Sequence, residues 1–332
     1  GGLVNTKPSL LLEPQSTNRF LYSEDLTQYN LSSTGTNSSN PIITSNYAIS
    51  PDGTRNADRV QFNAGTDSSG NSRITETFTI FGTTETISVY LKSNDGQEHT
   101  IDIIQSNQPQ DTVTVTSEWQ RFSFTRVNSS PDKYGIGLTG SNAETADILA
   151  WGFQLEQLSY ATSYIPTNGS TQTRAAETCF GAGTSSMFSN TEGILYMEFA
   201  DLYDGDNPTF RRYCTLSDGT TNNVVRITKP SSGTNQISYA IRIGGSAASS
   251  QIKSVTNIKD FNKVAIYYKS GNTKFYLNGV KESVVSATYT MFQPTTLSFG
   301  QFNGGNFLHS KCRDIRVYNT KEMTDSEVDI LL

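Results

Sequence analysis

The sequence predicts an all-β protein made of two tandem antiparallel β-sandwiches. Ser, Thr and Asn together account for 108 of the 332 residues and aromatic residues for 11%, whereas charged residues account for only 17%. Thr and the aromatic residues favour strands, and Asn, Ser and Gly favour turns. Short segments in which apolar and polar residues alternate recur along the chain, as strands with one buried and one wet face require. The length fits two domains, each of which can bury its own core.

Four alternating segments are found in the first half of the chain. In each of them apolar residues recur at alternate positions. In residues 85–93, for example, Ile87, Val89 and Leu91 alternate with Ser88, Tyr90 and Lys92. Turn signals such as the SPDGT of residues 50–54 separate strands. We therefore expect a first sandwich whose strands include residues 85–93, 99–106, 118–126 and 147–157.

Residues 159–177 show no alternation and contain Pro166 and Gly169, so we expect the boundary between two domains here. The first domain is expected over residues 1–174 and the second over residues 178–332. After the boundary the alternation resumes in eight segments, which is typical of a second sandwich. These segments are residues 193–199, 211–219, 223–228, 236–244, 262–271, 273–279, 295–300 and 313–319.

Three local signals refine the second domain. Asn278-Gly279 is the pair that best tolerates the positive φ angles of a two-residue hairpin turn. Thr324 and Glu327 fit a capping box at the start of a short helix near the end of the chain. Residues 244–250, GGSAASS, lack the Lys and the helix of a phosphate-binding loop, so we interpret them as a hairpin turn.

Charge and hydropathy disfavour several kinds of partner. The net charge of −6 disfavours nucleic acid, whose recognition needs a surplus of Lys and Arg. The longest apolar run, Val264–Tyr268, is too short to cross a membrane. The chain begins with Gly1 rather than Met and shows no signal-peptide pattern, so we expect a fragment or a processed product. Cys179, Cys214 and Cys312 lack zinc-site spacing; three thiols are expected, and a Cys214–Cys312 bridge stays open.

Three segments of the first half resemble a module that recurs in bacteriophage tail-fibre and head-fibre proteins and in some bacterial surface proteins. They are LLLEPQSTNRFLYSEDLTQYN (residues 10–30), SPDGTRNADRV (50–60) and GFQLEQLSYATSYIPTNGSTQTRAA (152–176). The fold of that module looks like the jelly roll of carbohydrate-binding modules. The resemblance covers residues 10–176 and is not specific for one ligand.

The second half is similar to concanavalin A-like or laminin-G-like lectin domains. The matching pieces are GILYMEF (residues 193–199), KVAIYYKSGNTKFYLNG (263–279) and RDIRVYNTKEMTDSEVDIL (313–331), within about residues 184–332. Together the two resemblances imply a jelly roll followed by a concanavalin A-like sandwich, in a virion protein that touches a bacterial surface polysaccharide. They also imply other virion proteins as partners and assembly as a homo-trimer.

Such sandwiches also host glycosidases and polysaccharide lyases, so enzymatic activity is the main alternative. A retaining glycosidase needs two carboxylates about 5 to 5.5 Å apart, but Glu198 and Asp201 are three positions apart and point to opposite faces of an extended strand. Lys253 stands where the QIH strand of alginate-lyase-like sandwiches has its histidine. His99 and His309 lie in different expected domains, which gives a Ser-His-Asp triad no support. We therefore expect no enzymatic activity.

Sugars bind to aromatic rings and to planar polar side chains, so the polar strand faces supply the candidate glycan-binding residues. An ordinary solvated sheet surface is the alternative interpretation. The two domains have net charges of −7 (residues 1–174) and +1 (the remainder), so their ligand preferences should differ, and the basic face of the second suggests an acidic polysaccharide. The candidates are Tyr90, Lys92, Asp102, Arg121 and Gln154 in the first domain, and Arg226, Arg242, Tyr267, Lys269, Lys274 and Tyr276 in the second.

The jelly-roll resemblance further implies a structural Ca²⁺ held by carboxylates and carbonyls. Candidate donors are Glu24, Asp25 and Asp147, and the loop YDGDNP (residues 203–208) is an alternative. The sequence as a whole predicts a non-enzymatic glycan-binding adhesion protein on a virion surface or another extracellular or cell surface. A polysaccharide-degrading enzyme and a purely structural virion component are the alternatives.

Overall fold

The computed structural model describes residues 9–79, 84–105, 109–127, 132–202, 211–230, 233–301 and 309–331. The regular structure in them is almost entirely antiparallel β, which confirms the predicted fold class. The chain divides into two compact units, Gln15–Ala175 and Gly1–Pro14 together with Ala176–Leu332. We call them the N-terminal sandwich and the C-terminal sandwich, and each has its own hydrophobic core.

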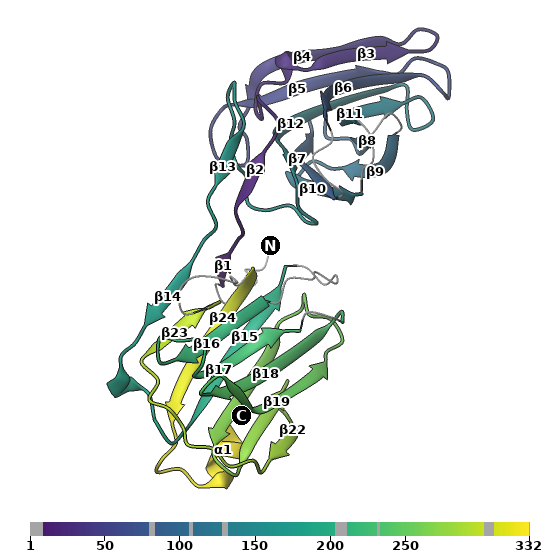
Figure 1. Cartoon of the computed structure of the whole chain (residues 1–332). Coiled ribbons are helices and arrows are strands. Elements are labelled where there is room, and N and C mark those ends of the chain that lie inside the picture. The colour runs from purple at the N-terminus through teal and green to yellow at the C-terminus, as the bar shows by residue number, and fades with distance from the viewer. Residues whose placement is uncertain are drawn as a thin grey trace. The chain divides into compact units, whose positions relative to one another are not determined.

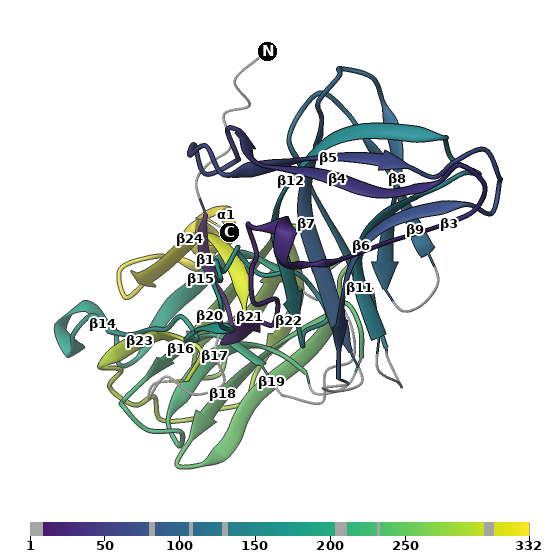
Figure 2. The same cartoon turned by 90° about the horizontal axis from the view of Figure 1, so that it is seen from above.

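The N-terminal sandwich contains two five-stranded sheets, whose strands are labelled in Figure 1 and, except for β10, in Figure 2. The alternation in the sequence places their apolar residues correctly, because Ile87, Val89 and Leu91 are fully buried in the core between the sheets. The first sheet has the order β10 (Gln120–Arg126), β7 (Glu85–Ser93), β12 (Thr145–Glu156), β5 (Ala57–Asn63) and β4 (Ser39–Ala48). The second has the order β3 (Asn30–Thr34), β6 (Asn71–Phe78), β11 (Asp132–Thr139), β8 (His99–Gln105) and β9 (Pro109–Val115).

The first and last segments of the N-terminal sandwich lie side by side. Strand β2 (Ser16–Asn18) pairs with β13 (Gln172–Arg174), as Figure 1 shows. A single 3-10 turn, η1 (Leu26–Gln28), follows β2 and begins at Asp25, whose side chain accepts a hydrogen bond from the Thr27 N–H. The closing segment, residues 159–169, is thereby held beside the loop that enters η1, since Tyr22 forms an isolated bridge with Asn168.

The C-terminal sandwich consists of two six-stranded sheets. The first has the order β1 (Leu10–Leu12), β24 (Ser310–Asn319), β15 (Glu192–Asp201), β20 (Asn262–Lys269), β21 (Thr273–Leu277) and β22 (Val280–Val285). The second has the order β14 (Cys179–Ala182), β23 (Thr296–Phe299), β16 (Arg211–Ser217), β17 (Val224–Lys229), β18 (Gln236–Ile243) and β19 (Ser246–Ser254). A 3-10 turn, η2 (Ser185–Met187), follows β14.

Strand β1 departs from the expected assignment of residues 1–174 to the first domain. It pairs with β24, and Leu12 is buried in the core of the C-terminal sandwich. A three-residue strand is too short to show an alternation, so its partner cannot be recognised from the residues alone.

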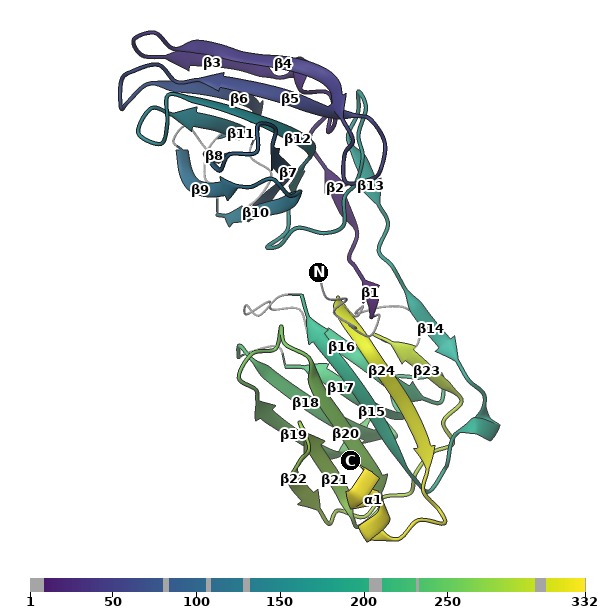
Figure 3. The ribbon, with the colours of Figure 1, turned by 180° about the vertical axis from the view of Figure 1, so that it is seen from behind.

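Two of the three local signals of the second domain are found where the sequence places them. The third is only partly right: Gly244 and Gly245 form the turn between β18 and β19, but residues 246–250 belong to β19, because they pair with β18. Asn278 and Gly279 have φ angles of 52° and 82° in the turn between β21 and β22. Helix α1 (Asp325–Leu331) begins with the expected capping box, in which the Thr324 N–H donates to Glu327 at 2.7 Å and the Glu327 N–H donates back to the Thr324 hydroxyl at 3.3 Å. Helix α1 packs on the outer face of the sheet that contains β15, β20 and β21 (Figure 3).

The three cysteines are free thiols, and burial raises the pKa of Cys312 to about 11. Cys214 and Cys312 belong to the core of the C-terminal sandwich, whereas Cys179 is half-buried. In the described part of the chain, helices are all too short or too polar to span a membrane.

Candidate functional site

The closing segment of the N-terminal sandwich covers part of the sheet face on which we expected a ligand. Tyr90 pairs with Arg121 and with Trp151, so the strands do share one sheet. The Arg121 guanidinium, however, donates to the Thr162 carbonyl at 2.7 Å. Gln154 is fully buried, and its Oε1 accepts a hydrogen bond from the Ile165 N–H at 2.7 Å. These polar groups therefore bind the chain's own backbone.

The aromatic residues of this face also contact other parts of the chain. The Trp151 ring, which is 3% exposed, packs against Tyr164 of the closing segment at a centroid distance of 4.4 Å and against Tyr90 at 5.3 Å. The Arg121 guanidinium lies 5.4 Å from the Tyr90 ring centre. Aromatic and cationic groups packed in this way stabilise the closure of the sandwich.

Lys92 and Asp102, the other two candidates of the first domain, do not take part in these contacts with the closing segment. Lys92 is half-buried on β7, opposite Leu149. Asp102 lies on β8, in the other sheet, and is 2% exposed; the Asn142 side chain donates to it at 3.0 Å. Burial raises the pKa of Asp102. The five candidates of the first domain thus do not form one binding face.

Helix α1 covers the tyrosine-rich candidates of the second domain. Tyr267, Lys274 and Tyr276 are at most 4% exposed. Asp329 of α1 accepts hydrogen bonds from Lys274 Nζ at 2.9 Å and from the Tyr276 hydroxyl, and Lys281 Nζ lies 2.7 Å from its other oxygen. The basic face predicted for an acidic polysaccharide is therefore the surface on which the chain's own acidic helix docks.

The remaining candidates of the second domain are separated from that surface. Lys269 forms an ion pair with Glu192 at 3.1 Å. Arg226 and Arg242 are half-buried on β17 and β18, which belong to the other sheet. Arg242 donates to the carbonyl of Gly245 in the hairpin turn that follows.

The residues weighed for catalysis also have structural partners. Asp201 is buried and accepts a hydrogen bond from Tyr213 at 2.7 Å, whereas Glu198 lies half-buried opposite Asp314 on β24. Lys253 pairs with Glu282 at 3.0 Å. His99 lies 2.9 Å from Asp95 in the N-terminal sandwich, and His309 belongs to the C-terminal unit.

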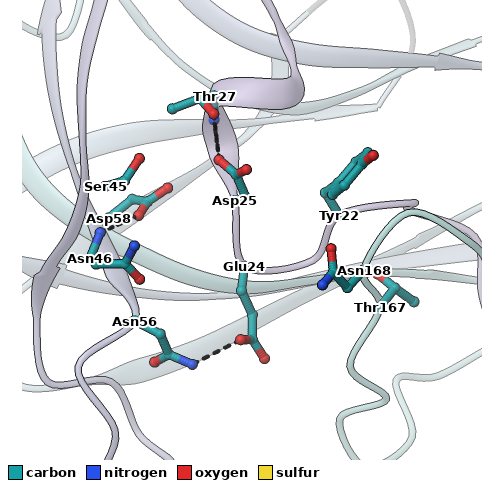
Figure 4. Close-up of a pocket in the computed structure, with 10 residues that line it drawn as sticks. All are labelled: Tyr22, Glu24, Asp25, Thr27, Ser45, Asn46, Asn56, Asp58, Thr167 and Asn168. Atoms are coloured by element: carbon teal, nitrogen blue, oxygen red, sulfur yellow. Dashed lines mark hydrogen bonds between the residues drawn. The ribbon is translucent and has the colours of Figure 1, made fainter.

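A candidate site that joins an aromatic ring to several polar side chains is a pocket of about 350 Å³ in the N-terminal sandwich, shown in Figure 4. It opens between the loop that leads into η1, strand β4, the start of β5 and the closing segment. One lining residue is aromatic and the rest are polar. The lining residues are Tyr22, Glu24, Asp25, Thr27, Ser45, Asn46, Asn56, Asp58, Thr167 and Asn168.

Asp58 fixes two walls of this pocket. It is 1% exposed, and its two oxygens accept hydrogen bonds of 2.9 Å from the N–H groups of Leu26 and Asn46. Burial raises the pKa of Asp58, and the two N–H donors counteract that rise. Asn46 has a φ angle of 53°, a left-handed conformation that Asn tolerates better than most residues. The result is a bent β4 whose Asn46 side chain borders the pocket.

Glu24 and Asp25 carry the other two carboxylates of the pocket. Glu24 accepts hydrogen bonds of 2.8 Å from Asn56 Nδ2 and from the Tyr164 hydroxyl. Asp25 caps η1 and accepts from the Thr27 N–H at 3.1 Å and from Gln28 at 3.1 Å. These donors are all neutral, so they orient the carboxylates without cancelling their charge.

The structure does not bring the three expected calcium donors together. Glu24 and Asp25 line the pocket, but Asp147 lies on β12 and forms an ion pair with Arg59 at 2.5 Å. In the described ranges, groups of three or more His, Cys, Asp or Glu side chains suited to a metal ion are not found. The alternative loop, residues 203–208, lies outside the described residues.

Of the pocket residues, the sequence singled out only Glu24 and Asp25. Six others belong to the same three segments that carry the phage-module resemblance, within residues 10–30, 50–60 and 152–176. They lie mostly in loops, where strand alternation carries no information. The clustering of Asp, Asn and Tyr in these three turn-rich segments is the signal that could have identified them.

No protein-family model and no curated protein sequence matches the chain. The chain is similar to the carbohydrate-binding module CBM40 of the Ruminococcus gnavus IT-sialidase, bound to α2,3-sialyllactose: identity is 12%, coverage is 46% of this chain and 92% of that one, and the TM-score is 0.35. It is also similar to a leech intramolecular trans-sialidase, with 15% identity, coverage of 43% of this chain and 23% of that one, and a TM-score of 0.33. For Xenopus laevis galectin-Ib the identity is 12%, the coverage is 42% of this chain and 99% of that one, and the TM-score is 0.29. Each similarity covers less than half of this chain.

Proposed function

We propose that the chain is a non-enzymatic glycan-binding protein whose N-terminal sandwich holds a sugar in the pocket around Tyr22. The observation that carries the proposal is the composition of this pocket, which combines one aromatic ring with amide, hydroxyl and carboxylate side chains. A sugar ring stacks its C–H face on an aromatic ring, and planar polar groups bridge its hydroxyls. The volume of about 350 Å³ suits one or two sugar units at the edge of a longer chain.

The biological setting that we propose is a bacteriophage fibre at the virion surface. Support comes from the resemblance of residues 10–176 to fibre modules. In this setting the protein attaches to a bacterial surface polysaccharide, alongside other virion proteins and as a homo-trimer.

Retention on immobilised bacterial surface polysaccharides tests the proposal. Tyr22→Ala removes the ring but keeps the Tyr22 carbonyl, which accepts a hydrogen bond from Tyr29 at 2.5 Å, so the fold is expected to survive. We expect retention of the wild type, about tenfold or greater weakening in Tyr22→Ala, and near-normal binding in Tyr22→Phe, which keeps the ring.

The same incubation separates the alternatives. Release of reducing ends or of unsaturated sugars would contradict a non-enzymatic role. Failure of every polysaccharide to retain the wild type would favour a structural virion component. Equal retention of Tyr22→Ala and the wild type would place the binding site elsewhere.

A further inference from the structure

We propose that the pocket around Tyr22 selects sugars that carry a free, protonated amino group and rejects sugars that carry a carboxylate. This inference rests on the proposed function and names the class of its ligand. It starts from the charge of the pocket. Three carboxylates, Glu24, Asp25 and Asp58, line it, and a fourth, Asp52, approaches the side-chain nitrogen of Asn56 at 3.5 Å.

These four carboxylates have no basic partner among the described ion pairs. Arg55 donates to the Asn46 carbonyl at 3.2 Å, and Arg174, which lines a neighbouring hollow together with Glu24, donates to the Ser163 carbonyl at 3.3 Å. Neither arginine lines the pocket. The lining of the pocket therefore contains carboxylates and no cationic side chain, and its negative charge repels a sugar carboxylate and attracts an ammonium group.

Hydrogen-bonding capacity points to the same ligand. Asn56 must direct its amide nitrogen at Glu24, because a carboxylate only accepts hydrogen bonds. The Oδ1 of Asn56 is thereby left as a buried acceptor without a partner in the described chain. Together with the carboxylates this makes a pocket rich in acceptors, and an ammonium group supplies three donors and no acceptor.

Thr167 is a second, independent sign of a polar ligand. Its side chain is 6% exposed and borders the pocket, yet its hydroxyl has no hydrogen-bond partner in the described part of the structure. A buried hydroxyl without a partner is costly, so such groups in proteins usually bind water or another polar group. The Thr167 hydroxyl can donate to or accept from a sugar hydroxyl beside the amine.

The test measures binding of the full chain to three oligosaccharides of equal length. They are a chitosan oligosaccharide with free amines, its fully N-acetylated counterpart and an oligogalacturonate. At about pH 6 a sugar amine is protonated and most carboxylates remain ionised. We expect the free-amine oligosaccharide to bind about tenfold or more tightly than the N-acetylated one, and the oligogalacturonate to show no binding. A rise from about 0.05 M to about 0.5 M salt should reduce the preference.

Two matched variants locate the effect. Asp25→Asn removes one pocket charge and keeps an oxygen that can accept from the Thr27 N–H. Glu118→Gln removes one charge from an exposed position outside the pocket. We expect Asp25→Asn to reduce the free-amine preference several-fold and Glu118→Gln to leave it unchanged.

The possible failures are distinguishable. If the N-acetylated or acidic oligosaccharide binds as tightly as the free-amine one, and Tyr22→Ala abolishes that binding, the proposed function stands and the charge selectivity is wrong. If the free-amine oligosaccharide binds equally to the wild type and to Asp25→Asn, its binding reflects the net negative charge of the protein, and the inference is overturned. If the wild type binds neither these probes nor any surface polysaccharide, the inference and the proposed function fail together.

Discussion

At the residue scale, Gln154 shows how a polar side chain on the outer face of a strand is buried when another segment of the chain, here the closing segment, covers that face. Its Oε1 accepts from the Ile165 N–H, and its amide nitrogen lies 3.4 Å from the carbonyls of Thr162 and Ser163. In Gln154→Ala a buried N–H loses its acceptor, so we expect the free energy of unfolding of the N-terminal sandwich to fall by about 1–3 kcal/mol.

Urea unfolding followed by tryptophan fluorescence measures this loss, because both tryptophans of the chain lie in the N-terminal sandwich. Gln97→Ala, at an exposed position of the same unit, is the matched control. Equal midpoints for the two variants would show that Gln154 does not hold the closing segment.

At the scale of the element, the docking of α1 depends on one ionised carboxylate. Burial alone would raise the pKa of Asp329, but hydrogen bonds from Lys281, Tyr276 and Lys274 hold it well below its usual range. An acid whose folded-state pKa is depressed stabilises the fold above its unfolded-state pKa of about 3.9, and this contribution is lost as the pH falls through the folded-state value. The protection of α1 should therefore be constant from neutral pH to about pH 5 and fall on further acidification.

Asp329→Asn should remove this acid-sensitive protection. We expect the hydrogen-exchange protection of α1 at neutral pH to fall by roughly 1–2 kcal/mol, a modest value because the Asp329 side chain is 34% exposed and solvent screens its ion pairs. Tryptophan fluorescence of the N-terminal sandwich should not change. The exposed substitution Asp260→Asn serves as the control, and an α1 equally protected in both variants would contradict the assigned role of Asp329.

At the scale of the whole molecule, the sequence predicts architecture better than it predicts function. Strand alternation reports which side chains are buried, so the all-β fold, the positions of 12 of the 24 described strands and the hairpin at Asn278 follow from local residues. The same alternation cannot report which segment later covers an outer face. It therefore predicted Gln154 and Lys274 as ligand-binding residues, although Gln154 bonds to the closing segment and Lys274 bonds to Asp329 of α1.

The pocket escaped prediction for a related reason. Its walls come from three stretches, residues 22–27, 45–58 and 167–168, which are far apart in the sequence and meet only in the folded sandwich. Neither the left-handed turn at Asn46 nor the burial of Asp58 has a local signature. The polar faces of the strands therefore give no indication of this site.

The location of a bound oligosaccharide decides whether the pocket around Tyr22 holds the sugar. Hydrogen–deuterium exchange of the full chain, with and without a retained oligosaccharide, reports that location through protected peptides. We expect new protection in peptides covering residues 22–27, 45–58 and 165–168, and none in peptides covering Arg226, Arg242 or Tyr276. Protection confined to strands β17 and β18, or to the sheet under α1, would contradict this expectation.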